Sequence, residues 1–284
     1  MIIKTYGCPF SHDVSSCVGK VPSNHTWHHT QSLGETDESK IALYCDFDIS
    51  GALNDTTNEY KFLWLSESRA IAYDQNKYFC KNFDAMCDAY DAIFTHDRKY
   101  LCSMLSKKNI RYIPPASNLT WIKDPGIREK SKICSFICSG KEQCPGHRIR
   151  NETAKKVAHG NNVDLYGRFF GSPIEKKEEA LDHYMFSFTF ENAAYDDYYT
   201  EKIMDCFATG TIPVYYGMPG IGKFFNEDGI IRVDYNTNLE ELLQSLTPEL
   251  YESKMDAVRE NYEKCISTEL ADDMIYREIK DIVG

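Results

Sequence analysis

The segment MFSFTFENAAYDDYYTEKIMDCFATGTIPVYYG, residues 185–217, decides how the chain is expected to fold. MFSFTFE and TIPVYYG are apolar runs of strand length, each bounded by polar residues. Between them, Ile203, Cys206 and Phe207 recur at i, i+3 and i+4, which is the spacing of one helix face. A strand, a loop, a helix and a second strand in this order predict a βαβ unit of a parallel sheet.

The polar residues of this segment fall where the first strand ends and the helix begins. Thr200 is a candidate N-cap and Gly210 a candidate C′ residue. The free N–H groups of a helix start suit a phosphate, and Lys202 adds a full positive charge. Glu201 does not favour phosphate but can accept hydrogen bonds from sugar hydroxyls, and Tyr198 offers a flat face or a hydroxyl. The corner therefore suits a sugar diphosphate; a capped helix with a solvated lysine remains the alternative.

Strands alternate with helices along the rest of the chain. The expected strands are residues 40–48, 61–67, 92–96, 109–113, 132–140, 163–167 and 230–234, and the expected helices lie near residues 83–90, 98–107, 147–160, 175–184 and 239–265. This order predicts two doubly wound α/β domains, residues 1–125 and 126–284, joined through a turn-rich linker. Ligands of such sheets bind beyond the carboxyl ends of the strands, so we expect a cleft between the domains.

The bulk composition excludes some classes of partner. The chain has 284 residues and a net charge of −11, and an acidic chain is a poor partner for nucleic acid. No apolar run approaches the roughly 20 residues of a membrane helix, so no transmembrane segment is expected. The 11 cysteines show no framework and, without a signal peptide, are expected to be reduced.

Two clusters contain residue types that bind zinc: His25, His28 and His29, and the series Cys134, Cys138, Cys144 and His147. The histidine cluster has no acidic or cysteine ligand at the usual spacing, which favours a polar loop. Cys134 and Cys138 fall on one face of an expected strand, which favours core thiols. No metal site is therefore expected.

The residues 190–225, FENAAYDDYYTEKIMDCFATGTIPVYYGMPGIGKFF, resemble the signature of the α-1,3/4-fucosyltransferases, glycosyltransferase family 10. The shared features are the F-x-F-E-N strand end, Y-x-T-E-K, a helix, and P-V-x-x-G-x-P, in that order. The resemblance weakens back to about residue 132 and reaches the N-terminal half only through FLWLSES, residues 62–68. It implies a GT-B architecture, two Rossmann-like domains facing an interdomain cleft, in agreement with the reading from periodicity.

The resemblance also implies an activity and a set of site residues. The activity is inverting transfer of fucose from GDP-fucose to a hydroxyl of a glycan acceptor, in α-1,3 linkage. The implied donor-binding residues are Arg150, Glu191, Asn192, Tyr198, Glu201 and Lys202. Arg148 competes with Arg150 for the position of the diphosphate arginine. Glu67 matches the family's N-terminal glutamate, which is the general base.

In this scheme Glu67 takes the proton of the acceptor hydroxyl while Arg150, Lys202 and the helix amides stabilise the leaving diphosphate. Two cations can replace a divalent metal, so no cofactor is required, although DFD at residues 46–48 matches the D-x-D pattern of metal-dependent transferases. Two alternatives stay open: a GT-B transferase that uses another nucleotide sugar, and a catalytically silent glycan-binding protein of the same fold. The chain is expected to be soluble, either cytoplasmic in a bacterium or in the host cell of a virus, or the soluble domain of a longer protein.

Overall fold

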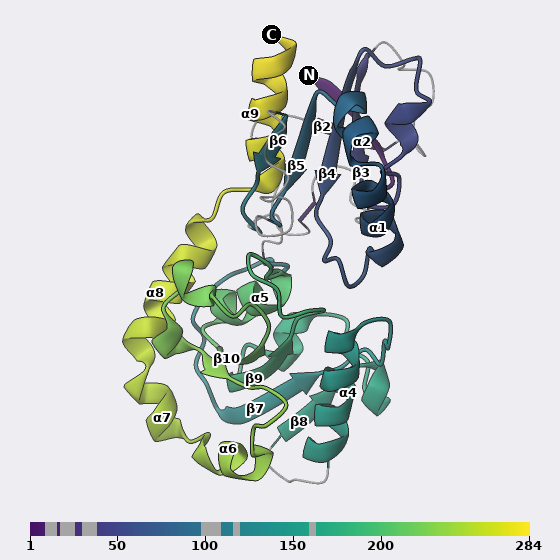
Figure 1. Ribbon diagram of the computed structural model, residues 1–284. Coiled ribbons are helices and arrows are strands. Elements are labelled where there is room, and N and C mark those ends of the chain that lie inside the picture. Colours follow the sequence, from purple (N-terminus) through teal and green to yellow (C-terminus); the bar gives the residue numbers. More distant parts are fainter. Residues whose placement is uncertain (9–15, 18–25, 30–38, 98–108, 116–119, 159–162) are drawn as a thin grey trace. The chain divides into compact units, whose positions relative to one another are not determined.

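The chain divides into two compact units. The computed structural model describes residues 1–8, 16–17, 26–29, 39–97, 109–115, 120–158 and 163–284. The N-unit comprises Met1–Asn118, Asp196–Tyr198 and Glu269–Gly284, and the C-unit comprises Leu119–Tyr195 and Tyr199–Thr268. Each unit contains one parallel sheet (Figure 1).

The N-unit sheet has six parallel strands in the order β2-β1-β3-β4-β5-β6. The strands are β1 Ile2–Tyr6, β2 Thr26–His29, β3 Ile41–Cys45, β4 Tyr60–Leu65, β5 Ala92–Thr95 and β6 Ile110–Tyr112. The last four were predicted from their apolar runs, whereas β1 and β2 were not. Because every pairing is parallel, the carboxyl ends of the strands meet at one edge.

Helices cover both faces of this sheet, and the alternation of side chains along β3 and β4 assigns the residues to each face. Leu43 and Phe62 pack in one apolar cluster with α9, Ala271–Val283. Tyr44 and Leu63 pack in a second cluster with α1, Tyr73–Lys81, and α2, Phe83–Ala89. Buried strands with two apolar faces are typical of α/β sheets covered on both sides.

The C-unit sheet has five parallel strands in the order β11-β10-β9-β7-β8. The strands are β7 Lys132–Ile137, β8 Val163–Tyr166, β9 Tyr184–Phe190, β10 Ile212–Tyr216 and β11 Ile231–Arg232, and the helices are α4 Pro145–Val157, α5 Glu201–Thr209, α6 Leu239–Ser245, α7 Pro248–Ser253 and α8 Met255–Ser267. Phe136 of β7 stacks on Phe188 and Phe190 of β9, with ring centroids 5.0 and 5.6 Å apart. Cys134 and Cys138 are core thiols, as predicted.

The structure differs from the sequence-based domain division at the C-terminal end. Residues 126–284 were expected to form one domain, but α9 belongs to the N-unit because its buried residues Ala271, Ile275 and Ile279 join the apolar face of that sheet. The boundary between the units also falls at residue 118 rather than 125. Periodicity identifies an apolar helix face but does not say which sheet the face covers.

A second difference concerns the helix expected at residues 175–184. Only one 3-10 turn forms there, Lys177–Ala180, and β9 starts at Tyr184. The carboxylate of Glu179 accepts hydrogen bonds from the backbone N–H groups of residues 175 and 176 in a capping box that begins this turn. The strand that starts at Tyr184, which pairs with Lys132, limits how far the turn can extend. The helix expected near residues 98–107 and the helix end at Gly160 lie outside the described residues.

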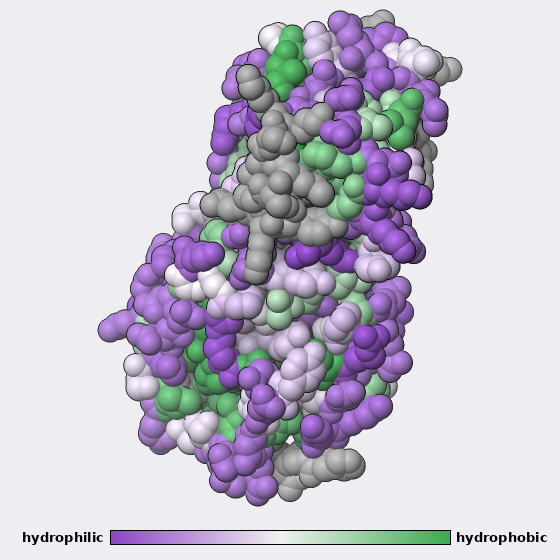
Figure 2. All heavy atoms as spheres, viewed as in Figure 1, coloured by the Kyte–Doolittle hydropathy of each residue, from purple (hydrophilic) through white to green (hydrophobic). Residues whose placement is uncertain are grey.

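The space-filling view shows one face of the molecule coloured by hydropathy (Figure 2). Most of the face drawn in Figure 2 is polar, and apolar side chains appear there in small groups. Within the described residues, none of the helices combines the length and the hydropathy that crossing a bilayer would need.

Replacing Ile275 with alanine should destabilise the N-unit by about 2–5 kcal/mol, since the side chain is fully buried against the sheet. Chemical denaturation monitored by circular dichroism measures this loss. Lys280→Ala changes an exposed residue of the same helix and should cost less than about 0.5 kcal/mol. Equal effects of the two substitutions would show that α9 does not complete this core.

Candidate functional site

Five of the six predicted donor residues, all except Tyr198, belong to the C-unit and lie at the end of β9 and along α4 and α5. Glu191 and Asn192 directly follow β9, and the backbone N–H of Gly146 in the first turn of α4 donates to the Asn192 carbonyl at 3.1 Å. A Cβ atom on Gly146 would lie 2.1 Å from the Glu191 carbonyl oxygen, so only glycine fits there. Sequence analysis did not single out this glycine. Two helix starts thus meet at the carboxyl edge of the sheet, the arrangement that binds anions.

Glu191 closes the loop between β9 and α5. Its side chain is fully buried, and its two carboxylate oxygens accept hydrogen bonds from the backbone N–H and the hydroxyl of Thr200, at 2.8 and 2.7 Å. Burial raises the pKa of Glu191, while the ammonium of Lys202, 3.7 Å from Oε2, opposes that shift. The carboxylate therefore supports the loop from within the protein.

Thr200 caps α5 as predicted. Its Oγ1 accepts hydrogen bonds from the backbone N–H of Lys202 at 3.3 Å and from the Lys202 ammonium at 3.0 Å. Gly210 ends the helix with φ +71°, the left-handed conformation expected of a C′ glycine. Thr200 thus links the capped helix to the Glu191 carboxylate.

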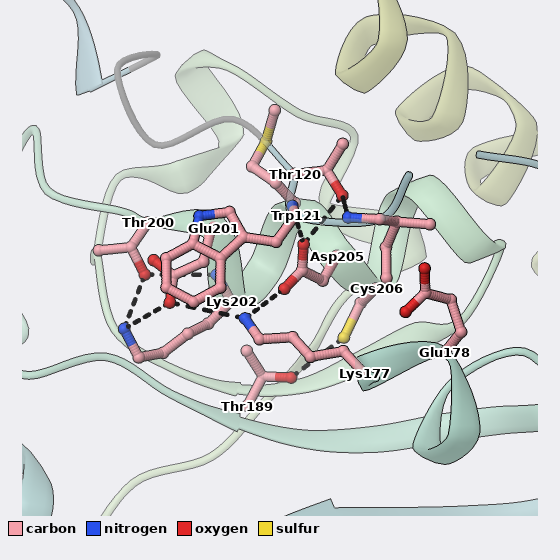
Figure 3. A network of polar contacts seen from close by, with 12 residues as sticks. Thr120, Trp121, Lys177, Glu178, Thr189, Thr200, Glu201, Lys202, Asp205 and Cys206 are labelled. Atoms are coloured by element: carbon pink, nitrogen blue, oxygen red, sulfur yellow. Dashed lines mark hydrogen bonds and ion pairs between the residues drawn. The ribbon is translucent and has the colours of Figure 1, made fainter. Parts of the chain in front are cut away.

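A cluster of alternating charges lies along the first turn of α5 (Figure 3). The ammonium groups of Lys202 and Lys177 lie 3.4 and 3.6 Å from the same oxygen, Oε1 of Glu201. Lys177 also lies 2.5 Å from Oδ2 of the buried Asp205, and its ammonium lies 4.3 Å from the ring centroid of Trp121. Burial alone would raise the pKa of Glu201, but the charges of Lys202 and Lys177 outweigh it and hold the pKa at about 2.

Sequence analysis missed Lys177. The residue belongs to the segment expected to be an ordinary helix before β9, and nothing in its local spacing relates it to α5. The acidic and basic residues in α5 itself, by contrast, were recognisable because they follow the N-cap. An ion pair between residues of two different elements cannot be recognised from a single sequence.

The start of α4 adds a buried cation to this edge. The Arg150 side chain is 6% exposed, and its Nη2 donates to the Lys141 carbonyl at 3.0 Å and to Oδ1 of Asn151 at 3.3 Å. Its Nε has no hydrogen-bond partner among the described residues. Arg148, the rival, is exposed on the same helix.

His147 lies between the two predicted cations. Its burial, followed by the nearby charges of Arg150 and Lys202, lowers the pKa of His147 to about 4. The imidazole is therefore neutral at neutral pH, and its Nδ1 accepts a hydrogen bond from the backbone N–H of Gln143 at 3.2 Å. Sequence analysis considered His147 only as a zinc ligand; its position beside Arg150, Lys202 and Asn192 instead makes it part of the donor edge.

Tyr198 is grouped with the N-unit, whereas the other predicted donor residues belong to the C-unit. It is buried, and its ring packs edge-on against His96 with centroids 5.4 Å apart. The preceding residue, Asp197, has φ +58°, the only positive value at a non-glycine position among the described residues.

Glu67 follows β4 at the carboxyl edge of the N-unit sheet, half-buried, and its Oε2 accepts from the backbone N–H of Ser68 at 3.2 Å. The fully buried Asp46 fixes this turn: it accepts from the Ser66 hydroxyl at 2.6 Å and from the backbone N–H groups of Ser66 and Glu67 at 3.1 and 3.0 Å. The first aspartate of the D-x-D pattern thus holds the turn that carries Glu67.

No group of three or more histidine, cysteine or acidic side chains able to hold a metal occurs among the described residues. His25 and the side chains of His28 and His29 lie outside that description. The expectation that the protein has no metal site therefore remains a prediction.

Known proteins resemble the C-terminal half most clearly. Residues 127–264 match the model of the family described as "Glycosyltransferase family 10 (fucosyltransferase) C-term". Over 128 residues, 43% of this chain, 37% are identical to an alpha-(1,3)-fucosyltransferase of Helicobacter pylori, and over 132 residues, 45% of this chain, 28% are identical to alpha-(1,3)-fucosyltransferase 7 of Homo sapiens. A GDP-fucose protein O-fucosyltransferase 3 of Rattus norvegicus is 29% identical over 139 residues, 44% of this chain. The matches span 25%, 38% and 27% of those proteins.

Solved structures extend the likeness in fold to both units. A crystal structure of an alpha1,3-fucosyltransferase covers 99% of this chain and 89% of its own, with a TM-score of 0.59 and 16% identity. A structure of an alpha1,3-fucosyltransferase with GDP-fucose covers 92% of this chain and 81% of its own, with a TM-score of 0.53 and 17% identity. At this identity the comparison establishes the fold.

Two parallel α/β sheets with this likeness define a protein of the GT-B class, as predicted. The interdomain cleft stays a prediction. Within that class, residues 127–264 are similar to the C-terminal part of glycosyltransferase family 10, the fucosyltransferases.

Thr200→Val should destabilise the C-unit by about 1–3 kcal/mol, because it removes the N-cap and one donor to the buried Glu191 carboxylate. Thr200→Ser keeps the hydroxyl and should cost less than about 1 kcal/mol. Urea denaturation compares the two variants. A valine variant as stable as the serine variant would show that the hydroxyl bonds are unimportant.

Proposed function

We propose that this protein is an inverting glycosyltransferase that moves fucose from GDP-fucose to a hydroxyl of a glycan acceptor, in α-1,3 linkage. The observation that carries the proposal is the pair of cations, Arg150 of α4 and Lys202 in the first turn of α5, whose charges both act on the buried His147. These residues lie within the segment that matches family 10. Relatives named alpha-(1,3)-fucosyltransferases support the linkage.

On the donor side, the diphosphate binds at the starts of α4 and α5. Arg150 and Lys202 contact its oxygens, and the helix N–H groups add partial positive charge. Glu201, ionised between its two lysines, accepts hydrogen bonds from donor sugar hydroxyls. Asn192 and Tyr198 complete the donor set, while Glu191 contributes through the loop it holds in place.

On the acceptor side, Glu67 acts as the general base. Its carboxylate takes the proton of the acceptor hydroxyl while that oxygen bonds to the anomeric carbon of fucose. The bond from this carbon to the diphosphate oxygen breaks on the opposite face, and its electron pair leaves with GDP, which inverts the configuration. Arg150 and Lys202 stabilise the charge that grows on GDP, so the reaction needs no divalent metal.

A second candidate differs in the acceptor. Several relatives are named GDP-fucose protein O-fucosyltransferase 3, at 28–30% identity. A hydroxyl of a protein side chain is therefore the alternative acceptor for the same donor. Labelled GDP-fucose tested on a panel of oligosaccharides and of unglycosylated proteins separates the two acceptors.

GDP should bind the protein, and Lys202→Ala should weaken this binding at least about tenfold, since a charge-assisted contact to the diphosphate is lost. Isothermal titration calorimetry measures both affinities. Lys156→Ala removes an exposed lysine of α4 and should leave the affinity unchanged. If GDP gives neither heat of binding nor a thermal shift, the protein is not a GDP-sugar enzyme. If the protein turns over another nucleotide sugar and not GDP-fucose, the proposed donor is wrong.

Glu67→Gln should lower the rate of transfer by about 10²–10⁴-fold, because glutamine cannot accept the proton. GDP affinity should stay unchanged, since the donor residues lie in other segments. Glu59→Gln, an exposed change in the same unit, serves as the control. Activity that survives the Glu67 change within about threefold would rule out this residue as the base.

A further inference from the structure

Lys177 brings a charge to the donor edge from outside the family signature. It lies in the 3-10 turn that precedes β9, and its ammonium lies 3.6 Å from Oε1 of Glu201. Lys202 approaches the same oxygen at 3.4 Å. Figure 3 shows the two lysines converging on the start of α5 from different elements.

The position of Lys177 is itself fixed by buried groups. Asp205 is 1% exposed, and its Oδ2 lies 2.5 Å from the Lys177 ammonium. The other oxygen of Asp205 accepts hydrogen bonds from the Thr120 hydroxyl at 2.8 Å and from the backbone N–H of Trp121 at 2.7 Å. The Trp121 ring lies 4.3 Å from the same ammonium, a cation–π contact. The Asp205 carboxylate and the Trp121 ring thus fix the position of the Lys177 ammonium.

We propose that Lys177 is a positioning residue for donor binding: together with Lys202 it holds the Glu201 carboxylate ionised and in the orientation that receives donor hydroxyls. Asp205 and Trp121 act one step further away, by holding Lys177. The inference rests on the proposed function, because it assigns Glu201 to the donor.

A direct contact of Lys177 with the donor diphosphate is the competing role. The geometry favours positioning, because the Lys177 ammonium is already neutralised by the buried Asp205 and covered by an aromatic ring. The Lys177 charge therefore acts mainly on the neighbouring carboxylate of Glu201. The two roles differ in what they predict when Glu201 is also replaced.

The pH dependence follows from the charges that face Glu201. Lys177 and Lys202 favour its ionised form, whereas burial and the carboxylates Asp205 and Glu191 oppose it. With both lysines present the pKa of Glu201 is about 2, so the carboxylate stays ionised throughout the range from pH 5 to 8. Without Lys177 the pKa rises, and Glu201 is increasingly protonated as the pH falls, which weakens any binding that needs the carboxylate.

The test compares Lys177→Met with the wild-type protein by calorimetry, using GDP and GDP-fucose at pH 7.5 and pH 5.0. We expect the variant to lose at least about tenfold in affinity for GDP-fucose at pH 7.5 and at least as much at pH 5.0, relative to the wild type at each pH. Lys177→Arg keeps the charge and should restore affinity to within about threefold. Lys156→Met, an exposed lysine of the same unit, should bind as the wild type does.

A double variant separates positioning from direct contact. If Lys177 acts through Glu201, Lys177→Met should cost little further affinity in a Glu201→Gln background. Additive losses in the two backgrounds would overturn the proposal in favour of direct contact, and unchanged affinity of Lys177→Met would remove any role. If the methionine variant does not fold, Lys177→Gln gives the same comparison. A wild-type protein that does not bind GDP would instead reject the proposed function.

Discussion

The buried carboxylate of Glu191 is the contact on which the donor edge depends. It joins the end of β9 to Thr200, and Thr200 in turn caps α5 and receives the ammonium of Lys202. Removing a buried carboxylate of this kind leaves its donors unpaired, so the loop, the helix start and the cation are held or lost together. The same strand end also accepts from Gly146, which sets the start of α4 against it.

Much of the fold was predictable because it depends on local patterns. Apolar runs such as those of β9 and β10 bury both faces of a parallel sheet, and this composition is visible in the sequence. The placement of α9 was not predictable, since the sequence of an apolar helix face does not indicate which sheet the helix packs against. The helix expected at residues 175–184 is shorter for a different reason: Tyr184 pairs with Lys132 in the sheet, and this long-range pairing has no signal in the local sequence.

The residues of the candidate site also fall into two groups: those that local spacing along the chain predicts, and those whose role depends on contacts across the fold. Thr200, Glu201 and Lys202 were predictable because capping and charge at a helix start are matters of spacing along the chain. Lys177 and Gly146 were missed because their importance arises from contacts across the fold, with Glu201 and with the Glu191 carbonyl. Asp46 was interpreted through a three-residue pattern, whereas its burial under Ser66 and Glu67 gives it a supporting role beside the proposed base.

The return of α9 to the N-unit has a consequence for how the chain folds as it is made. The N-unit core includes Ala271, Ile275 and Ile279, which leave the ribosome only after the whole C-unit has been synthesised. Domains generally fold as units during synthesis, so the C-unit sheet can complete its core while the N-unit sheet still exposes one apolar face. The N-unit is therefore synthesised first but completes its core last. Until α9 is made, the apolar face of the N-unit sheet is the surface that a chaperone would need to cover.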